Sequence, residues 1–183
     1  PLELGDAGGE AFLVRGPRSA VLGWVFRTDR VAPQVRGMHG EIGALVGLGT
    51  DGCASNNDLD MLLEIDTMAK LHKVSTMNPT VMDAATALQI ATTGGARVLG
   101  LQHLIGTIEP GKRADLIMVN MRQPHLTPLY HLYSQIVYAC RGSDVRDVII
   151  NGKVVMRNRT LLTLDVAKVM DDVREIAERV RRK

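Results

Sequence analysis

The 183-residue sequence predicts an α/β protein, on three observations. The run Ala44–Thr50 is apolar on both faces, which is typical of a buried strand in a parallel sheet. Apolar residues then recur at helical spacing over parts of 59–99. Finally, Asn151-Gly152 separates two β-branched runs, as in a two-residue hairpin. The predicted order is a buried strand, helices, a small antiparallel β unit and a terminal helix.

The first elements are predicted from apolar periodicity. Residues 1–36 show neither a helical nor a strand period, although the apolar patch 20–26 is compatible with a strand or a helical turn. An amphipathic helix is predicted over 59–74, and Asn78-Pro79 ends it.

The next helix is predicted from its capping pattern. Thr80 stands at the expected start, and Asp83 lies three residues later, as in a capping box. The helix is expected to stop at Gly94-Gly95, and a second short helix is expected after it.

The C-terminal part reads as β structure followed by a helix. The run 106–119 predicts a strand, a Pro110-Gly111 turn and a second strand at 115–119. From about Asp165, one amphipathic helix is predicted, with Asp165 as its N-cap. The residues of its apolar face are Val166, Val169, Met170, Val173, Ile176, Ala177 and Val180.

Composition narrows the function classes. The net charge is only +2 and aromatic residues make up 3%, so we expect no nucleic-acid partner. No apolar run approaches the length of a membrane span, so we expect no membrane partner. Cys53 and Cys140 form no metal-binding or disulfide pattern, and we read them as reduced thiols of a cytoplasmic protein.

Asp51 follows the predicted buried strand directly. Ligands of parallel sheets bind at the carboxyl ends of the strands, where this carboxylate is placed. A carboxylate there can hold a metal ion and accept a proton from water. Asp-Gly is equally a common turn pair, so spacing alone leaves both readings open.

Three longer stretches carry a family resemblance. They are "VGLGTDGCASNNDLDMLLEIDTMAKLHK", "ALQIATTGGARVLGL" and "IGTIEPGKRADLIMVN", and "QPHLTPLYHLYSQIVYACRGSDV" points to the same subgroup. Over about two thirds of its length, the chain resembles the C-terminal part of amidohydrolase-superfamily enzymes. Within that superfamily it is most similar to the 5-methylthioadenosine/S-adenosylhomocysteine deaminases.

The resemblance implies a fold and a chemistry. The fold would be the C-terminal fragment of a TIM-type (β/α) barrel, with part of a small β-sandwich and a terminal helix. Asp51 would be a ligand of a divalent metal, zinc or alternatively iron, and would relay the proton of the attacking water. Ser55 and Asn56 would contact the purine nucleoside substrate, or else cap the next helix. The implied divisions are an unmatched lead-in (1–36), the last barrel strand with its helices (37–105), sandwich strands (106–160) and the terminal helix (161–183).

Departures from the family pattern limit this reading. The family's His-x-His pair and its later metal-binding histidines do not occur, and we read the five histidines present (His39, His72, His103, His125 and His131) as surface or structural. A single carboxylate cannot hold a catalytic metal, so we expect the isolated chain to be inactive. The alternatives are a triazine chlorohydrolase or guanine deaminase type of enzyme, or a non-catalytic remnant.

Two further expectations follow from the partial match. One barrel strand cannot close a barrel, and unpaired sheet edges favour association, so a homo-oligomer is expected. The likeness also stops abruptly near Val31, and our hypothesis is that the residues before it come from a shifted reading frame or an aberrant start.

Overall fold

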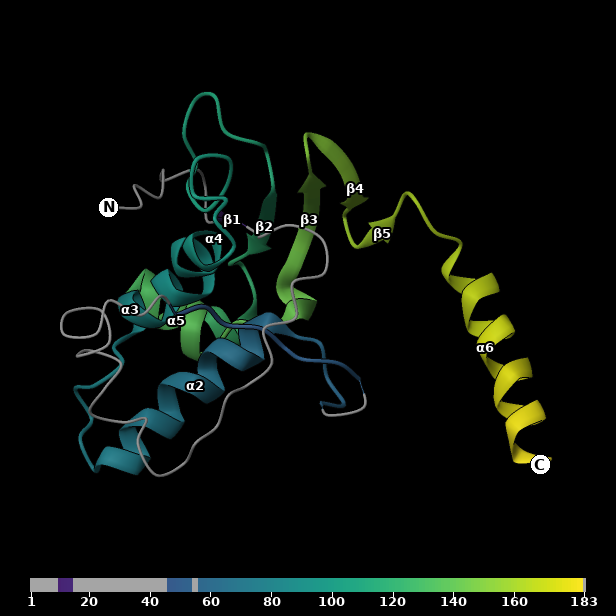
Figure 1. The fold of residues 1–183 in the computed structure, drawn as a ribbon, viewed down its shortest axis with the longest axis horizontal. Helices are drawn as coiled ribbons and strands as arrows, with labels where there is room; N and C mark the ends of the chain where they lie inside the picture. The colour runs from purple at the N-terminus through teal and green to yellow at the C-terminus, as the bar shows by residue number, and fades with distance from the viewer. Residues whose placement is uncertain (1–9, 15–45, 54–55, 183) are drawn as a thin grey trace.

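A computed structural model of the chain describes residues 10–14, 46–53 and 56–182 (Figure 1). Its α-helices are α2 (Met61–Thr76), α3 (Ala84–Gln89), α4 (Gly95–Val98), α5 (Leu132–Tyr138) and α6 (Val166–Arg181). A π-helical segment, η1 (Ile90–Gly94), and two 3₁₀ segments, η2 (Pro124–Leu126) and η3 (Gly142–Asp144), complete the helical elements. The strands are β1 (Glu10–Val14), β2 (Leu116–Asn120), β3 (Val145–Ile150), β4 (Lys153–Arg157) and β5 (Thr160–Leu161).

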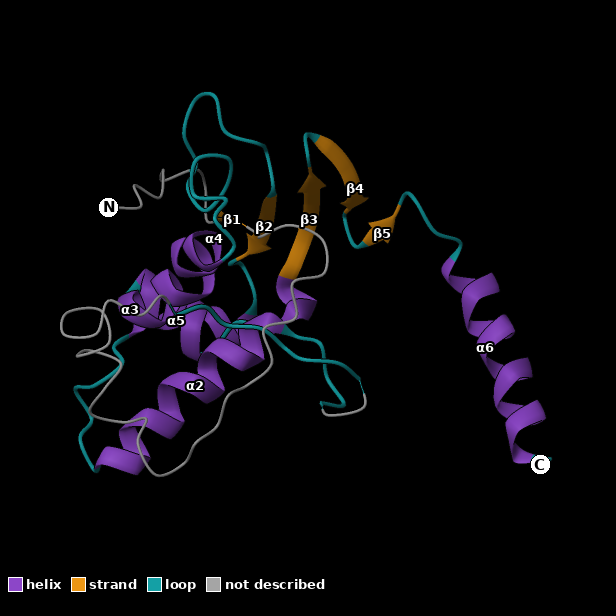
Figure 2. Cartoon of the chain, viewed as in Figure 1, coloured by secondary structure: helices purple, strands orange, loops and turns teal. Residues whose placement is uncertain are grey.

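The strands form one antiparallel sheet in the order β1-β2-β3-β4-β5 (Figure 2). Strand β1 comes from the lead-in, where the sequence predicted no definite element, and it pairs with β2 from Glu10 opposite Asn120 to Val14 opposite Leu116. The other apolar patch of the lead-in, 20–26, lies outside the described residues. The predicted combination of helices and a small antiparallel β unit is confirmed.

The predicted hairpin is also confirmed. Strands β3 and β4 are joined by Asn151 and Gly152, whose φ values are +50° and +75°. Both angles are positive, as a two-residue turn between twisted antiparallel strands requires. Asparagine and glycine are the residues that adopt this region at least cost, so the turn residues themselves fix the hairpin.

Helix α2 forms close to the predicted range. Its N-cap is Asp60, whose Oδ1 accepts from the backbone N–H of Leu62 at 2.9 Å. Its C-cap is Met77, in the left-handed region at φ +50°, just before Asn78-Pro79. The helix buries Leu62, Glu64, Ile65, Asp66, Met68 and Ala69.

The predicted limits of the second helix were wrong at both ends. Its N-cap is Asp83 rather than Thr80, because the Asp83 carboxylate accepts from the N–H of Thr86 at 3.1 Å. The helix does not stop at Gly94-Gly95 but continues through η1 and α4 to Val98. Both glycines have right-handed helical angles, with φ of −60° and −56°, so neither ends the helix.

The strand predicted at 44–50 is not formed over its described part, residues 46–50. A strand needs a neighbour to receive its backbone hydrogen bonds, and the described residues offer this segment none. The strand predicted before the Pro110-Gly111 turn is likewise absent. Gly106 has φ of +100°, which is incompatible with extended strand geometry, and the segment packs against α4 instead.

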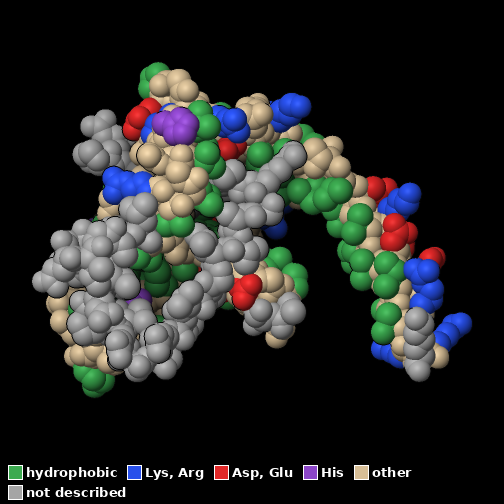
Figure 3. All heavy atoms as spheres, in the orientation of Figure 1, with side chains coloured by type: hydrophobic (Ala, Val, Ile, Leu, Met, Phe, Trp, Pro, Cys, Tyr) green, Lys and Arg blue, Asp and Glu red, His purple; other side chains and the backbone are tan. Residues whose placement is uncertain are grey.

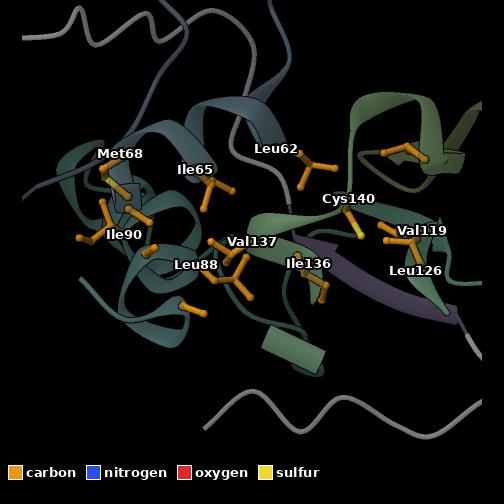
Figure 4. Close-up of a cluster of buried hydrophobic side chains, with 14 of the residues drawn as sticks. Leu62, Ile65, Met68, Leu88, Ile90, Val119, Leu126, Ile136, Val137 and Cys140 are labelled. Carbon is orange, nitrogen blue, oxygen red and sulfur yellow. The ribbon is translucent and has the colours of Figure 1, made fainter. Parts of the chain in front are cut away.

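One buried cluster joins the helices to the sheet. Figure 4 shows side chains of α2, α3 and α5 meeting those of β2. The largest fully buried side chains are Leu88, Leu126, Ile136, Val119, Val137 and Cys140. Helix α5, which the sequence analysis did not predict, contributes Ile136 and Val137 to the centre of this cluster.

Helix α6 forms as predicted, with Asp165 as its N-cap. It stands apart from the sheet and from the other helices (Figure 1), and none of its residues is buried. Neither α6 nor any other helix in the described ranges has the length and apolar character needed to cross a membrane.

Candidate functional site

Close backbone packing places the segment that leads to Asp51. A Cβ added at Gly94 would lie 2.6 Å from the carbonyl oxygen of Val46, and one added at Gly47 would lie 3.1 Å from Cα of Gly95. Separations this short are possible only because these positions lack side chains. The segment 46–50 is therefore held against η1 and α4 by backbone contact, and Asp51 follows from it.

Asp51 occupies an unusual backbone conformation. Its φ of +58° lies in the left-handed region, which aspartate tolerates better than most residues. The half-buried side chain accepts a hydrogen bond at Oδ1 from the N–H of Gly52 at 2.7 Å. Within the described residues, Oδ2 has no hydrogen-bond partner. The Gly52 N–H thus orients the side chain through one carboxylate oxygen.

Asn56 orders the loop behind Asp51. Its amide nitrogen donates to the carbonyl oxygen of Thr50 at 3.0 Å and to Oε1 of Glu64 at 2.5 Å. Its own oxygen accepts from the N–H of Asp58 at 3.2 Å. The bond to Asp58 forms an Asx-type turn before α2, and the N-cap of that helix is Asp60 rather than Asn56. Ser55, the other predicted substrate contact, lies outside the described residues.

The start of α2 also connects to a distant part of the chain. While Oδ1 of Asp60 caps α2, its Oδ2 accepts from the N–H of Gly142 at 2.6 Å. Arg141 donates to Asp66, six residues further along α2, at 3.3 Å. Neither Glu64 nor Asp60 was predicted from the sequence. Isolated acidic residues near the start of a helix are common and do not by themselves indicate a functional contact.

The four described histidines have surface or structural surroundings. His103 is exposed, and His131 caps α5 through its side chain. Nε2 of His125 lies 3.0 Å from Oδ2 of the buried Asp144. Burial, assisted by the adjacent Lys73 charge, lowers the pKa of His72 below its ordinary value. The fifth histidine, His39, lies outside the described residues.

The donor set around Asp51 is incomplete for a metal. No three His, Cys, Asp or Glu side chains among residues 10–14, 46–53 and 56–182 lie close enough together to hold a metal ion. Asp51 offers one carboxylate, whereas zinc sites in enzymes usually have three ligands from the protein. The described residues therefore do not bring together a complete set of metal ligands.

Comparisons with curated proteins show close relatives. The chain is 54% identical over 139 residues to a 5-methylthioadenosine/S-adenosylhomocysteine deaminase 1 of Syntrophus aciditrophicus, a match covering 76% of this chain and 31% of that protein. It is 50% identical over 138 residues to a 5'-deoxyadenosine deaminase of Methanosarcina acetivorans, covering 75% of this chain and 32% of the relative. The chain thus spans about a third of the length of these curated relatives.

Solved structures similar to this chain include two enzymes with bound zinc. A zinc-bound adenosine deaminase from Xanthomonas campestris superimposes with a TM-score of 0.74 at 44% identity, over 77% of this chain and 32% of that one. The zinc complex of the atrazine chlorohydrolase TrzN from Arthrobacter aurescens superimposes with a TM-score of 0.65 over 78% of this chain and 33% of that one. At 24% identity, the second likeness bears on the fold alone.

A family comparison covers most of the chain. The sequence pattern described as the amidohydrolase family matches residues 26–155, which include Asp51, the loop that Asn56 orders and strands β2 and β3. The match begins within the lead-in that the sequence analysis left unassigned. The chain belongs to the amidohydrolase family.

Proposed function

We propose that this chain is part of a metal-dependent hydrolytic deaminase acting on adenosine-type thioethers such as 5-methylthioadenosine and S-adenosylhomocysteine. The 54% identity to a relative with that name carries the proposal. A match of 139 residues in a chain of 183 includes residues 45–139 wherever it starts, and therefore includes the Asp51 loop. The substrate is then a small purine nucleoside, and neither nucleic acid nor membrane is a partner.

Asp51 would take two roles in this reaction. Its Oδ2 would bind a divalent metal, and zinc is favoured over iron because the 44% identical adenosine deaminase from Xanthomonas campestris is described with bound zinc. A bound metal lowers the pKa of water towards neutrality and so supplies hydroxide as the nucleophile. Asp51 would accept a proton from the attacking water and return it to the leaving amino nitrogen, which would depart as ammonia. The Gly52 N–H holds the carboxylate in place for both transfers.

The remaining metal ligands would come from protein that this chain does not contain. The proposed fold is the C-terminal fragment of a TIM-type barrel, with part of a small β-sandwich formed by the antiparallel sheet. Its proposed divisions are 1–36, 37–105, 106–160 and 161–183. A cytoplasmic location is proposed on the two free thiols, Cys53 and Cys140.

The isolated chain is proposed to be inactive. The absence of a three-ligand group within the described ranges favours this, because one carboxylate does not retain a catalytic metal. Zinc titrated into the chain alone should show no tight site, whereas submicromolar binding would contradict this point.

The test of the main proposal begins with the DNA upstream of the codon for Pro1. If an upstream frame encodes the family's His-x-His pair and its later histidines, the longer chain is expressed and assayed for deamination of 5-methylthioadenosine. Asp51→Asn should then lower kcat by about 10³-fold, within the range that general acid–base groups contribute. Asp58→Asn is the matched control, since Asp58 is an exposed carboxylate of the same loop. An upstream frame without those histidines, or an active Asp51→Asn variant, would refute the proposal.

A further inference from the structure

The proposed function does not use the apolar face of α6. Six of its large side chains are between 46% and 68% exposed: Val166, Val169, Met170, Val173, Ile176 and Val180. In the view of Figure 3, hydrophobic side chains follow one edge of this helix and charged side chains follow the opposite edge. Exposed apolar stripes of this kind mark surfaces that another structure covers.

The family comparison does not account for this face. The amidohydrolase match ends at residue 155, and α6 begins at Val166. The described part of the chain buries none of the α6 residues either. The residues of α6 itself are therefore the evidence for what covers this face.

The spacing of the stripe is that of helices that pair with helices. Val166, Val173 and Val180 are seven residues apart, and so are Val169 and Ile176. Alternating steps of three and four residues place all five on a seam that a second helix can fill, as in a coiled coil. The seam runs the full 16 residues of α6, or about 24 Å.

The charges beside the seam indicate the partner and its direction. Asp165, Asp172 and Arg179 also lie seven residues apart and follow one edge of the stripe, while Met170 and Ala177 occupy the other edge. If two copies of α6 pair antiparallel, Asp165 of each faces Arg179 of the other, and the two apolar edges meet. A parallel pair would instead place the charged edge against the apolar edge.

We propose that a second copy of this chain covers the apolar face of α6, with the two helices antiparallel. The pairing places the N-cap Asp165 of each helix beside the basic last turn of the other helix, and it opposes the two helix dipoles favourably. At the centre of the pair, Asp172 of one copy faces Asp172 of the other. This like-charge contact limits the affinity of the dimer. The inference is independent of the proposed deaminase activity.

Sedimentation velocity of the 183-residue chain between 1 and 100 µM tests the pairing. The chain should dimerise reversibly, and Val173→Asp should weaken the dimer at least tenfold. Ala167→Asp is the matched control, because it adds the same charge on the outer face and should change the dissociation constant less than twofold. Asp172→Asn should tighten the dimer about two- to threefold by removing the central repulsion.

Several outcomes would overturn the proposal. They are a chain that stays monomeric at 100 µM, a Val173→Asp variant that dimerises like the wild type, and binding of the helix to anionic lipid vesicles in place of dimerisation. Circular dichroism shows whether α6 remains helical in each variant. Because α6 contributes no buried residue, none of these substitutions should unfold the rest of the chain.

Direction is tested by a distance between two spin labels. In a Cys53→Ser background, Arg181→Cys provides one exposed labelling position per chain, since Cys140 is buried. An antiparallel pair separates the two labels by about 30 Å along the helix axis. A parallel pair brings them side by side, and a separation below about 20 Å would reject the antiparallel arrangement.

Discussion

The side-chain amide of Asn56 donates a hydrogen bond to Oε1 of Glu64 at 2.5 Å. The same nitrogen donates to the carbonyl oxygen of Thr50, the residue before Asp51, at 3.0 Å. Glu64 is only 6% exposed, in the first turn of α2. Through one amide group, a buried carboxylate therefore fixes the backbone that presents Asp51.

Removal of this carboxylate should loosen the Asp51 loop. Glu64→Ala deprives a partly buried amide of its charged acceptor, and we expect the free energy of unfolding to fall by about 1.5–3 kcal/mol. Urea denaturation measures the loss, and faster hydrogen exchange of the amides at 50–52 locates it. Glu64→Gln retains an acceptor oxygen and should recover most of the stability. Equal stability of Glu64→Ala and wild type would show that the contact contributes nothing.

Two adjacent glycines should respond to alanine in opposite ways. A Cβ at Gly94 meets the Val46 carbonyl oxygen at 2.6 Å, whereas one at Gly95 meets nothing within 4 Å. Gly94→Ala should destabilise the chain by about 2 kcal/mol, because backbone must move. Gly95→Ala should be neutral or stabilise by up to about 1 kcal/mol, because alanine favours the helix. Urea denaturation of both variants is the measurement, and similar losses for the two would contradict the proposed packing of 46–50.

Acid should destabilise the sheet through Asp147. Burial alone would raise the pKa of this carboxyl, but hydrogen bonds from the Asn158 N–H, at 2.7 Å, and from Arg146 outweigh burial and hold the pKa below its ordinary value of 3.8. A folded-state pKa below the unfolded value means that the stabilisation is complete above pH 3.8 and is lost as pH falls towards the folded pKa. Asp147→Asn should therefore flatten the decline of unfolding free energy below about pH 4. A decline of unchanged steepness would assign the effect to other carboxyls.

The sequence predicted best the elements whose signals are local. The Asn151-Gly152 turn and the Asp165 cap each depend on a few adjacent residues, and both formed as expected. Helix α5 was missed because its cap is His131, an uncommon N-cap residue, and because its seven residues show too short a period. The predicted strand at 44–50 failed because pairing depends on neighbours that a local pattern does not specify.

The candidate site was predictable only in part. Asp51 was proposed from its motif and its place after an apolar run. The contact between Asn56 and Glu64 depends on a loop that brings together residues eight positions apart, and no propensity encodes that geometry. The contact between Asp60 and Gly142 spans 82 positions and follows only from the tertiary packing of α2 against η3.

The two cysteines should differ sharply in reactivity. Burial, with a smaller contribution from the Asp144 charge and an opposing one from Arg141, raises the pKa of the Cys140 thiol to about 12. At pH 8 its thiolate fraction is then only about 10⁻⁴, and its sulfur is also shielded from reagents. Cys53 is exposed in the Asp51 loop.

A thiol-reactive chromophore at pH 8 should therefore label one cysteine per chain quickly and the second only at the rate of unfolding. In Cys53→Ser the fast phase should vanish, while urea should release Cys140 in both proteins. Two fast thiols in the folded chain would mean that the cluster around Ile136 and Val137 opens readily, because only its opening exposes Cys140.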